Sequence, residues 1–148
     1  MTQQVRAKKY LGQHFLKDKE IARRIAESLP LSQAMPVLEV GPGMGVLTQY
    51  LLQNPLVDLT AVEIDRESVD YLHVHYPQLK VIEGDFLKMD LSVLYPNKFC
   101  IIGNFPYNIS SQIFFKVLDN RDRIPHVSGM IQKEVAERIA SAPGKKAY

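Results

Sequence analysis

The feature that most constrains the fold is a regular alternation of short apolar runs with segments of helical periodicity. The apolar runs, which we predict to be strands, cover residues 37–40, 59–62, 79–82, 99–102 and 127–131. Two strands joined through a helix pair in parallel with a right-handed crossover. The sequence therefore predicts a doubly wound α/β sheet, which binds its ligands beyond the C-terminal ends of the strands.

Each predicted helix is marked by an apolar face or by a capping residue. The first is capped by Asp18 and ends near Leu29, directly before Pro30. The second predicted helix runs through Val46 to Leu51, and the third contains Val69, Leu72 and Val74, with a short turn predicted at 91–95. The fourth starts at Ser110 and has Ile113, Phe114, Val117 and Leu118 as its apolar face. The last covers about Lys133 to Ala140.

Composition places the chain among ordinary globular proteins. Its 148 residues, 46% of them apolar, are enough for one compact domain with a core. It has no apolar run long enough to cross a bilayer and no signal-peptide stretch after Met1, so we expect a soluble, cytoplasmic protein without membrane contact. The single cysteine, Cys100, cannot form an internal disulfide and is predicted to be a buried core residue.

Charge is distributed unevenly along the chain. Residues 1–24 carry seven basic and two acidic side chains, a net charge of +5, whereas residues 58–90 carry eight acidic and three basic ones, a net charge of −5. A basic N-terminal arm can contact a phosphate backbone, but a solvated terminus has the same composition. Charge alone favours the solvated terminus.

The strongest local motif is the glycine cluster at 39–45, which follows the first predicted strand. Gly41 and Gly43 allow positive φ angles and close approach of a ligand to the backbone. The dinucleotide fingerprint requires a third glycine where Val46 stands, which argues against a nicotinamide or flavin cofactor. A tight turn without a ligand uses the same residues, so this cluster alone leaves ligand binding open.

Two acids follow the next strands at the same edge of the predicted sheet. Glu63 ends the second strand, where a carboxylate can accept both hydroxyl hydrogens of a ribose. Asp85 follows the third strand and can accept a hydrogen bond from an exocyclic amine such as that of adenine. The alternatives are a helix-dipole or capping role for Glu63, which Asp65 could equally fill, and a turn-forming role for Asp85.

The most specific segment is Asn104-Phe105-Pro106-Tyr107, which follows the fourth strand. An aromatic amine is a poor nucleophile, and oxygens of the Asn104 side chain and the Pro106 carbonyl that accept its protons favour the pyramidal nitrogen of the transition state. Tyr107 offers a ring on which a flipped base can stack. The alternative is a proline-containing turn with a surface tyrosine, which the nearby glycine cluster makes the weaker interpretation.

The histidines do not form a metal-binding pattern. His73 and His75 are two residues apart on a predicted helix and so point in different directions, which is typical of a solvated face. His14 and His126 have no cysteine or carboxylate partners at ligand spacing. We therefore predict no metal, and no serine or cysteine stands at a nucleophile turn.

Taken in order, these motifs resemble the ribosomal RNA adenine dimethyltransferases across nearly the whole chain. The matching segments are 8–16, 39–45, 63–65, 84–85, 104–110 and 132–135. The resemblance is closest to the enzymes that dimethylate two adjacent adenines near the 3′ end of small-subunit ribosomal RNA. Related erythromycin-resistance methylases act on large-subunit RNA.

The resemblance implies a Rossmann-like class I methyltransferase fold that binds S-adenosylmethionine. The implied cofactor-binding residues are His14, Leu16, Gly41, Gly43, Glu63, Asp85 and Asn104, and the implied catalytic residues are Asn104, Pro106 and Tyr107. At position 14 many members carry Asn, and at position 105 Leu or Ile is common where this chain has Phe105. The implied partner is small-subunit ribosomal RNA within a pre-ribosomal particle.

Family members continue into further strands and a helical C-terminal domain that helps to hold RNA. We therefore expect residues 1–148 to be an incomplete catalytic domain, cut after the fifth strand, with a basic arm at 1–17. An open sheet edge near residues 127–131 would then favour self-association. The rival functions are an assembly or RNA-binding factor of the same fold, a large-subunit RNA methylase, and a dinucleotide-dependent oxidoreductase, which Val46 opposes.

Overall fold

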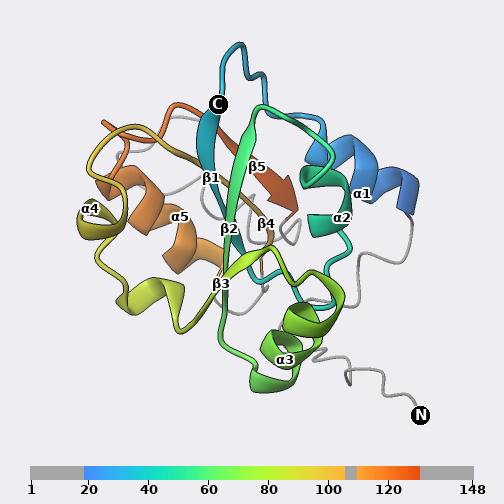
Figure 1. The fold of residues 1–148 in the computed structure, drawn as a ribbon. Helices are drawn as coiled ribbons and strands as arrows, with labels where there is room; N and C mark the ends of the chain where they lie inside the picture. The colour runs from blue at the N-terminus through green and yellow to red at the C-terminus, as the bar shows by residue number, and fades with distance from the viewer. Residues whose placement is uncertain (1–18, 106–109, 131–148) are drawn as a thin grey trace.

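A computed structural model describes residues 19–105 and 110–130 of the chain, which form a parallel sheet flanked by helices (Figure 1). The elements in chain order are α1 (Lys19–Ala26), β1 (Met35–Val40), α2 (Thr48–Leu51), β2 (Val57–Glu63), α3 (Arg66–His75), β3 (Lys80–Glu83), the 3₁₀ turn η3 (Phe86–Lys88), α4 (Leu91–Leu94), β4 (Cys100–Asn104), α5 (Ser110–Asp119) and β5 (Val127–Met130).

The five strands lie in the order β3-β2-β1-β4-β5, and every neighbouring pair is parallel. The central strand β1 pairs on both sides, with Val37 opposite Leu59 of β2 and opposite Cys100 of β4. The chain moves outward from β1 to β3, returns to the centre, and continues through β4 to β5. This arrangement confirms the predicted doubly wound α/β fold.

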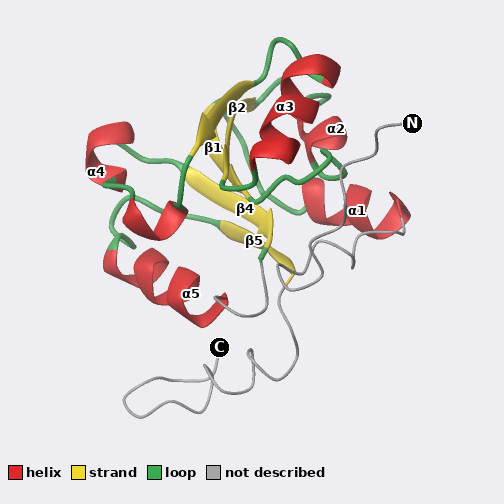
Figure 2. Ribbon diagram, turned by 90° about the horizontal axis from the view of Figure 1, so that it is seen from below, coloured by secondary structure: helices red, strands yellow, loops and turns green. Residues whose placement is uncertain are grey.

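Helices cover both faces of the sheet (Figure 2). Helices α1, α2 and α3 pack on one face, and η3, α4 and α5 pack on the other. The strands alternate between the two cores, so that Val37 faces the first layer and Leu38 the second. Because both faces are covered, the strands are nearly continuous apolar runs, and Cys100 is fully buried as predicted.

Two helix boundaries and one predicted helix face differ from the expectations. Helix α1 ends at Ala26, although Leu29 beyond it is still buried, and α2 begins at Thr48 instead of Val46 because the glycine turn extends further. Val74, predicted on the apolar face of α3, is 74% exposed, since the buried stripe of that helix contains Ser68, Val69 and Leu72. The predicted cap Asp18 and the predicted helix at 133–140 lie outside the described residues.

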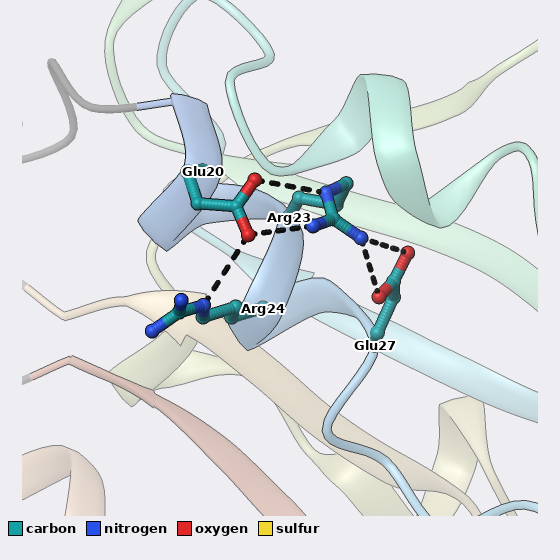
Figure 3. Close-up of polar contacts among 4 residues, drawn as sticks. All are labelled: Glu20, Arg23, Arg24 and Glu27. Carbon is teal, nitrogen blue, oxygen red and sulfur yellow. Dashed lines mark hydrogen bonds and ion pairs between the residues drawn. The ribbon is translucent and has the colours of Figure 1, made fainter.

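Helix α1 carries a network of exposed ion pairs (Figure 3). Arg23 contacts Glu20 at 2.5 Å and Glu27 at 3.1 Å, and Arg24 contacts Glu20 at 3.3 Å. Exposed pairs of this kind contribute about 0–1 kcal/mol each. Two of the seven basic residues counted over residues 1–24 are therefore already paired with carboxylates of their own helix, which reduces the charge available to an external phosphate. No helix in the described residues is long and apolar enough to cross a membrane.

Candidate functional site

The glycine loop lies between β1 and α2, at the C-terminal end of the central strand. Gly41, Gly43 and Gly45 have φ angles of 66°, 58° and 87°, a region that favours glycine. The Gly41 amide donates a hydrogen bond to the carbonyl of Val62 at 2.9 Å, and the Gly43 amide donates one to Oε1 of Glu63, also at 2.9 Å. The loop is thus tied to the end of β2 by two bonds.

A tyrosine from α3's C-terminal end closes the far side of this loop. A Cβ atom on Gly45 would lie 2.6 Å from the Tyr76 ring, so any other residue here would displace that ring and would also be strained at a φ of 87°. The Tyr76 hydroxyl is 3.5 Å from the Gly45 carbonyl oxygen, at the outer limit of a hydrogen bond. Gly45 therefore serves the packing of the loop, whereas Gly41 and Gly43 lie nearer the strand ends.

Glu63 ends β2 and is buried, with 2% of its surface exposed. Besides the bond from Gly43, its Oε2 accepts a hydrogen bond from the Asp65 amide at 3.0 Å. Burial raises the pKa of the Glu63 carboxyl, and the amides of Asp65 and Gly43 oppose that shift. A carboxylate has about four acceptor positions. The Ile64 amide also acts on this carboxyl, so that only part of its acceptor capacity remains for the hydroxyl donors of a ligand.

Asp65, not Glu63, caps helix α3. Its side chain accepts hydrogen bonds from the Ser68 amide at 3.1 Å and from the Ser68 hydroxyl at 2.8 Å. This assigns the capping alternative raised for Glu63 to its neighbour. Between the two acids, Ile64 is 58% exposed and presents an apolar side chain at the end of β2.

Asp85 starts the η3 turn, beside the end of β2. The Gly84 amide donates to the Glu63 carbonyl oxygen at 2.9 Å, which brings the β3 end against the β2 end. Oδ1 of Asp85 accepts a hydrogen bond from the Leu87 amide at 3.0 Å. Asp85 therefore has the turn-forming role given above as the alternative. This role uses its Oδ1 atom, and Oδ2 is the second carboxylate oxygen.

Asn104 ends β4 on the other side of β1 and is 5% exposed. A Cβ atom on Gly41 would lie 3.8 Å from the Asn104 carbonyl oxygen, so the glycine loop passes directly over this strand end. Phe105 is buried next to it and makes an edge-to-face contact with Phe114 at 5.6 Å. That ring holds the start of the loop that follows Asn104 against α5.

One buried acid was not recognised as a site residue from the sequence. Glu39 of β1 is fully buried, and its Oε1 accepts a hydrogen bond from the Thr48 hydroxyl at 2.6 Å. Its Oε2 has no hydrogen-bond partner among the described residues. Burial raises the Glu39 pKa to about 8, and the negative charge of Glu63 adds to the shift while the Thr48 bond opposes it. The available signal was an acid inside the apolar run Leu38-Glu39-Val40.

The structure thus gathers Gly41, Gly43, Glu63, Asp85 and Asn104 at the C-terminal ends of four adjacent strands. The remaining predicted site residues, His14, Leu16, Pro106 and Tyr107, lie outside the described residues. His73 and His75 are both exposed on α3. Carboxyl groups beside the glycine loop suit a ligand with hydroxyl donors and a positive charge, and a nucleoside with a cationic side chain has both.

Comparison with known families gives a match over residues 4–148 to the family described as ribosomal RNA adenine dimethylase. Proteins called ribosomal RNA small subunit methyltransferase A are similar in sequence. The one from Parabacteroides distasonis is 64% identical over 146 residues, which cover 97% of this chain and 54% of that protein. The one from Flavobacterium johnsoniae is 60% identical over 149 residues, covering 99% and 57%. The chain spans about half the length of these curated relatives.

Two solved structures share both fold and sequence with this chain. The 23S rRNA methyltransferase ErmE superposes with a TM-score of 0.71 at 32% identity, covering 89% of this chain and 53% of that one. A dimethyladenosine transferase from Plasmodium falciparum gives a TM-score of 0.68, also at 32% identity, covering 89% and 48%. A glycopeptide N-methyltransferase solved with S-adenosylmethionine shares the fold alone, at 19% identity and a TM-score of 0.51.

Proposed function

Because the chain belongs to the ribosomal RNA adenine dimethylase family, we propose that it transfers methyl groups from S-adenosylmethionine to the N6 amine of adenines in ribosomal RNA. The observation that carries the proposal is the convergence of the glycine loop, Glu63 and Asn104 at one edge of the sheet. A methyl donor held by the glycine loop and Glu63 would lie beside Asn104, which accepts a hydrogen bond from the target amine.

The cofactor half of the site consists of three contacts from neighbouring strands. Glu63 accepts the ribose hydroxyls with the acceptor positions that Gly43 and Asp65 leave open. Asp85 accepts a hydrogen bond from the adenine amine, while its Oδ1 keeps the η3 turn in place. Gly41, which carries no side chain, lets the ligand approach the backbone between β1 and β4. We expect His14 and Leu16 to add contacts from the N-terminal segment.

When bound, S-adenosylmethionine supplies an electrophilic methyl group on a positively charged sulfur. The protein's own contribution is to place the acceptor nitrogen in line with that methyl group. Asn104 accepts a hydrogen bond from one amine proton and the Pro106 carbonyl accepts one from the other, which favours the pyramidal nitrogen. Tyr107 stacks on the flipped base. With the methyl donor bound, the carbon–sulfur bond would break as the carbon–nitrogen bond forms, the sulfur would keep the electron pair, and the amine proton would leave to water.

Small-subunit RNA is the better-supported substrate. The relatives named for small-subunit methylation are 57% to 64% identical to this chain, whereas the 23S enzyme ErmE is 32% identical. We therefore propose that two adjacent adenines near the 3′ end of small-subunit ribosomal RNA are dimethylated, within a pre-ribosomal particle in the cytoplasm. A large-subunit substrate is the competing outcome of the test below.

The test supplies S-adenosylmethionine and unmethylated small subunits to the full-length protein, with large subunits in a parallel reaction. Nucleoside mass spectrometry then measures N6,N6-dimethyladenine in each RNA. We expect product in the small-subunit reaction, and a loss of at least about a hundredfold in rate for Asn104→Ala, since one oriented acceptor in a catalytic site contributes about that much. Asn97→Ala, which changes an exposed asparagine before β4, is the matched control and keeps the rate.

Product in the large-subunit reaction alone would show that the substrate is large-subunit ribosomal RNA. No product in either reaction would contradict the enzyme assignment. Binding of the RNA without methylation, in a protein that still binds S-adenosylmethionine, would favour an assembly factor.

A further inference from the structure

Lys116 of α5 reaches across to the turn that carries Asp85. Its ammonium donates a hydrogen bond to the Phe86 carbonyl oxygen at 2.6 Å and a second one to the carbonyl oxygen of Met89. The ammonium also lies 5.1 Å from the centre of the Phe86 ring. These two hydrogen bonds join residues 30 and 27 positions apart in the chain, and they connect α5 to the η3 turn.

The η3 turn has little means of holding its own shape. It contains three residues, and an isolated turn of this length is not stable in water. Its N-terminal end is closed by the Asp85 side chain, which accepts from the Leu87 amide. At its C-terminal end the Met89 amide donates to the Phe86 carbonyl oxygen at 3.2 Å, and Lys116 donates to that oxygen and to the Met89 carbonyl oxygen, where its positive charge suits a helix C-terminus. Loss of the ammonium therefore loosens the same turn that orients the Asp85 carboxylate.

The Lys116 side chain is partly buried in this position. Burial lowers the pKa of Lys116, and the carboxylates of Asp85 and Asp90 oppose that shift. A partly desolvated ammonium is costly unless its donors are satisfied. The two carbonyls satisfy two of its three donors, so the side chain has a defined position instead of a solvated ensemble.

The same helix follows the segment that contains the target-amine residues. Helix α5 begins at Ser110, six residues after Asn104, and Phe114 on it contacts the buried Phe105 ring. A single helix therefore touches both halves of the proposed site, with Phe114 at the end of β4 and Lys116 at the end of β3. The position of the η3 turn depends on this helix.

We propose that Lys116 is a positioning residue, which holds the η3 turn so that the Asp85 carboxylate meets the exocyclic amine of the cofactor's adenine. This inference rests on the proposed function, because it requires Asp85 to bind that amine. Lys116 itself does not contact the cofactor. Its effect is therefore specific to the amine, whereas a lysine that merely supported the packing of α5 would affect all ligands of the cleft equally.

The experiment compares two ligands that differ at one position of the base. Isothermal titration measures the dissociation constants of S-adenosylhomocysteine and of its purine (nebularine-type) analogue, whose base carries a hydrogen in place of the amine. A hydrogen bond to a charged group changes affinity by roughly tenfold or more. We expect the unaltered protein to prefer the adenosyl ligand by about tenfold or more, and Lys116→Met to bring this preference below about threefold, mainly by weakening adenosyl binding.

Lys88→Met is the matched control, because Lys88 is an exposed lysine on the η3 turn itself. It keeps the preference of the unaltered protein. Lys116→Arg, which retains charge and donors, restores part of the preference. Thermal unfolding is recorded for every variant, and Lys116→Gln carries the test if the methionine variant does not fold, with the same expected fall in preference.

Equal weakening of both ligands in a folded Lys116→Met or Lys116→Gln variant, or an unchanged preference, would overturn the positioning role alone. An unaltered protein that binds both ligands equally would overturn the assignment of Asp85, and the role of Lys116 with it. An unaltered protein that binds neither ligand would instead contradict the proposed function.

Discussion

Replacing Glu39 with glutamine should remove the pH dependence of the free energy of unfolding that the buried Glu39 carboxyl causes. The Glu39 carboxyl is fully buried and has a pKa of about 8 in the folded chain, against an ordinary value of 4.5. The groups around it are the Thr48 hydroxyl, the Glu63 carboxyl and the Tyr76 ring, none of which carries a positive charge. Between these two pKa values the folded chain binds the proton that the unfolded chain has released.

The sign follows from this difference in bound protons. Because the folded chain holds more protons at this group, the contribution of Glu39 to the free energy of unfolding is fully present below pH 4.5 and is lost as the pH rises towards about 8. One pKa unit corresponds to about 1.36 kcal/mol, so the loss from this one group between about pH 5 and about pH 7 is about 2.5 kcal/mol. Glutamine resembles the protonated acid and cannot ionise. It therefore avoids that loss, whatever constant cost its buried amide adds.

Urea denaturation at several pH values between about 5 and 8 measures the effect. The free energy of unfolding of Glu39→Gln minus that of the unaltered chain should rise by about 2.5 kcal/mol from about pH 5 to about pH 7. Taking the difference removes the titration of groups common to both proteins. A difference that stays constant within about 0.5 kcal/mol would show that Glu39 is ionised in the fold, and the account of its burial would be wrong.

Three further predictions concern stability and reactivity. Asp65→Ala removes the cap of α3 and should lower the free energy of unfolding by about 1 kcal/mol in urea denaturation, whereas no loss would mean that the cap contributes nothing. Gly103→Ala places a Cβ 2.4 Å from the Val40 carbonyl oxygen and should cost about 1–3 kcal/mol, while Gly84→Ala, whose Cβ would meet nothing nearer than 3.9 Å, is the matched control; equal losses would contradict the geometry. Burial raises the pKa of the Cys100 thiol, so a thiol reagent should react with it only after unfolding, and rapid reaction of the native chain would show that this core is open.

The gathering of the site could be predicted because it follows from topology. Parallel strands end at one edge of the sheet, so residues that follow strands, such as Gly43, Glu63 and Asn104, come together once the strands are recognised. The parallel, doubly wound class of the sheet could be predicted from the alternation of strands and helices, whereas the strand order β3-β2-β1-β4-β5 comes from the structure. Site residues can thus be predicted from the sequence where their place depends only on following the end of a strand.

Contacts between distant elements were not accessible in the same way. Glu39 was seen as part of a glycine motif, but its pairing with Thr48 depends on which face of β1 it occupies and on where α2 begins. The sequence analysis did not single out Lys116, because its carbonyl partners lie 27 and 30 residues away in the chain. Val74 was misassigned since three residues already fill the buried stripe of a short helix. Such contacts arise from packing, which no local periodicity encodes.

The central claim is that one nucleoside pocket forms where the glycine loop meets Glu63, Asp85 and Asn104. A crystal structure of the chain with S-adenosylhomocysteine tests this most directly. We expect the ribose hydroxyls within hydrogen-bond distance of the Glu63 carboxylate, the adenine amine at Asp85, and the sulfur on the Asn104 side of Gly41. A ligand bound elsewhere, or one in this cleft whose ribose is turned away from Glu63, would contradict the account.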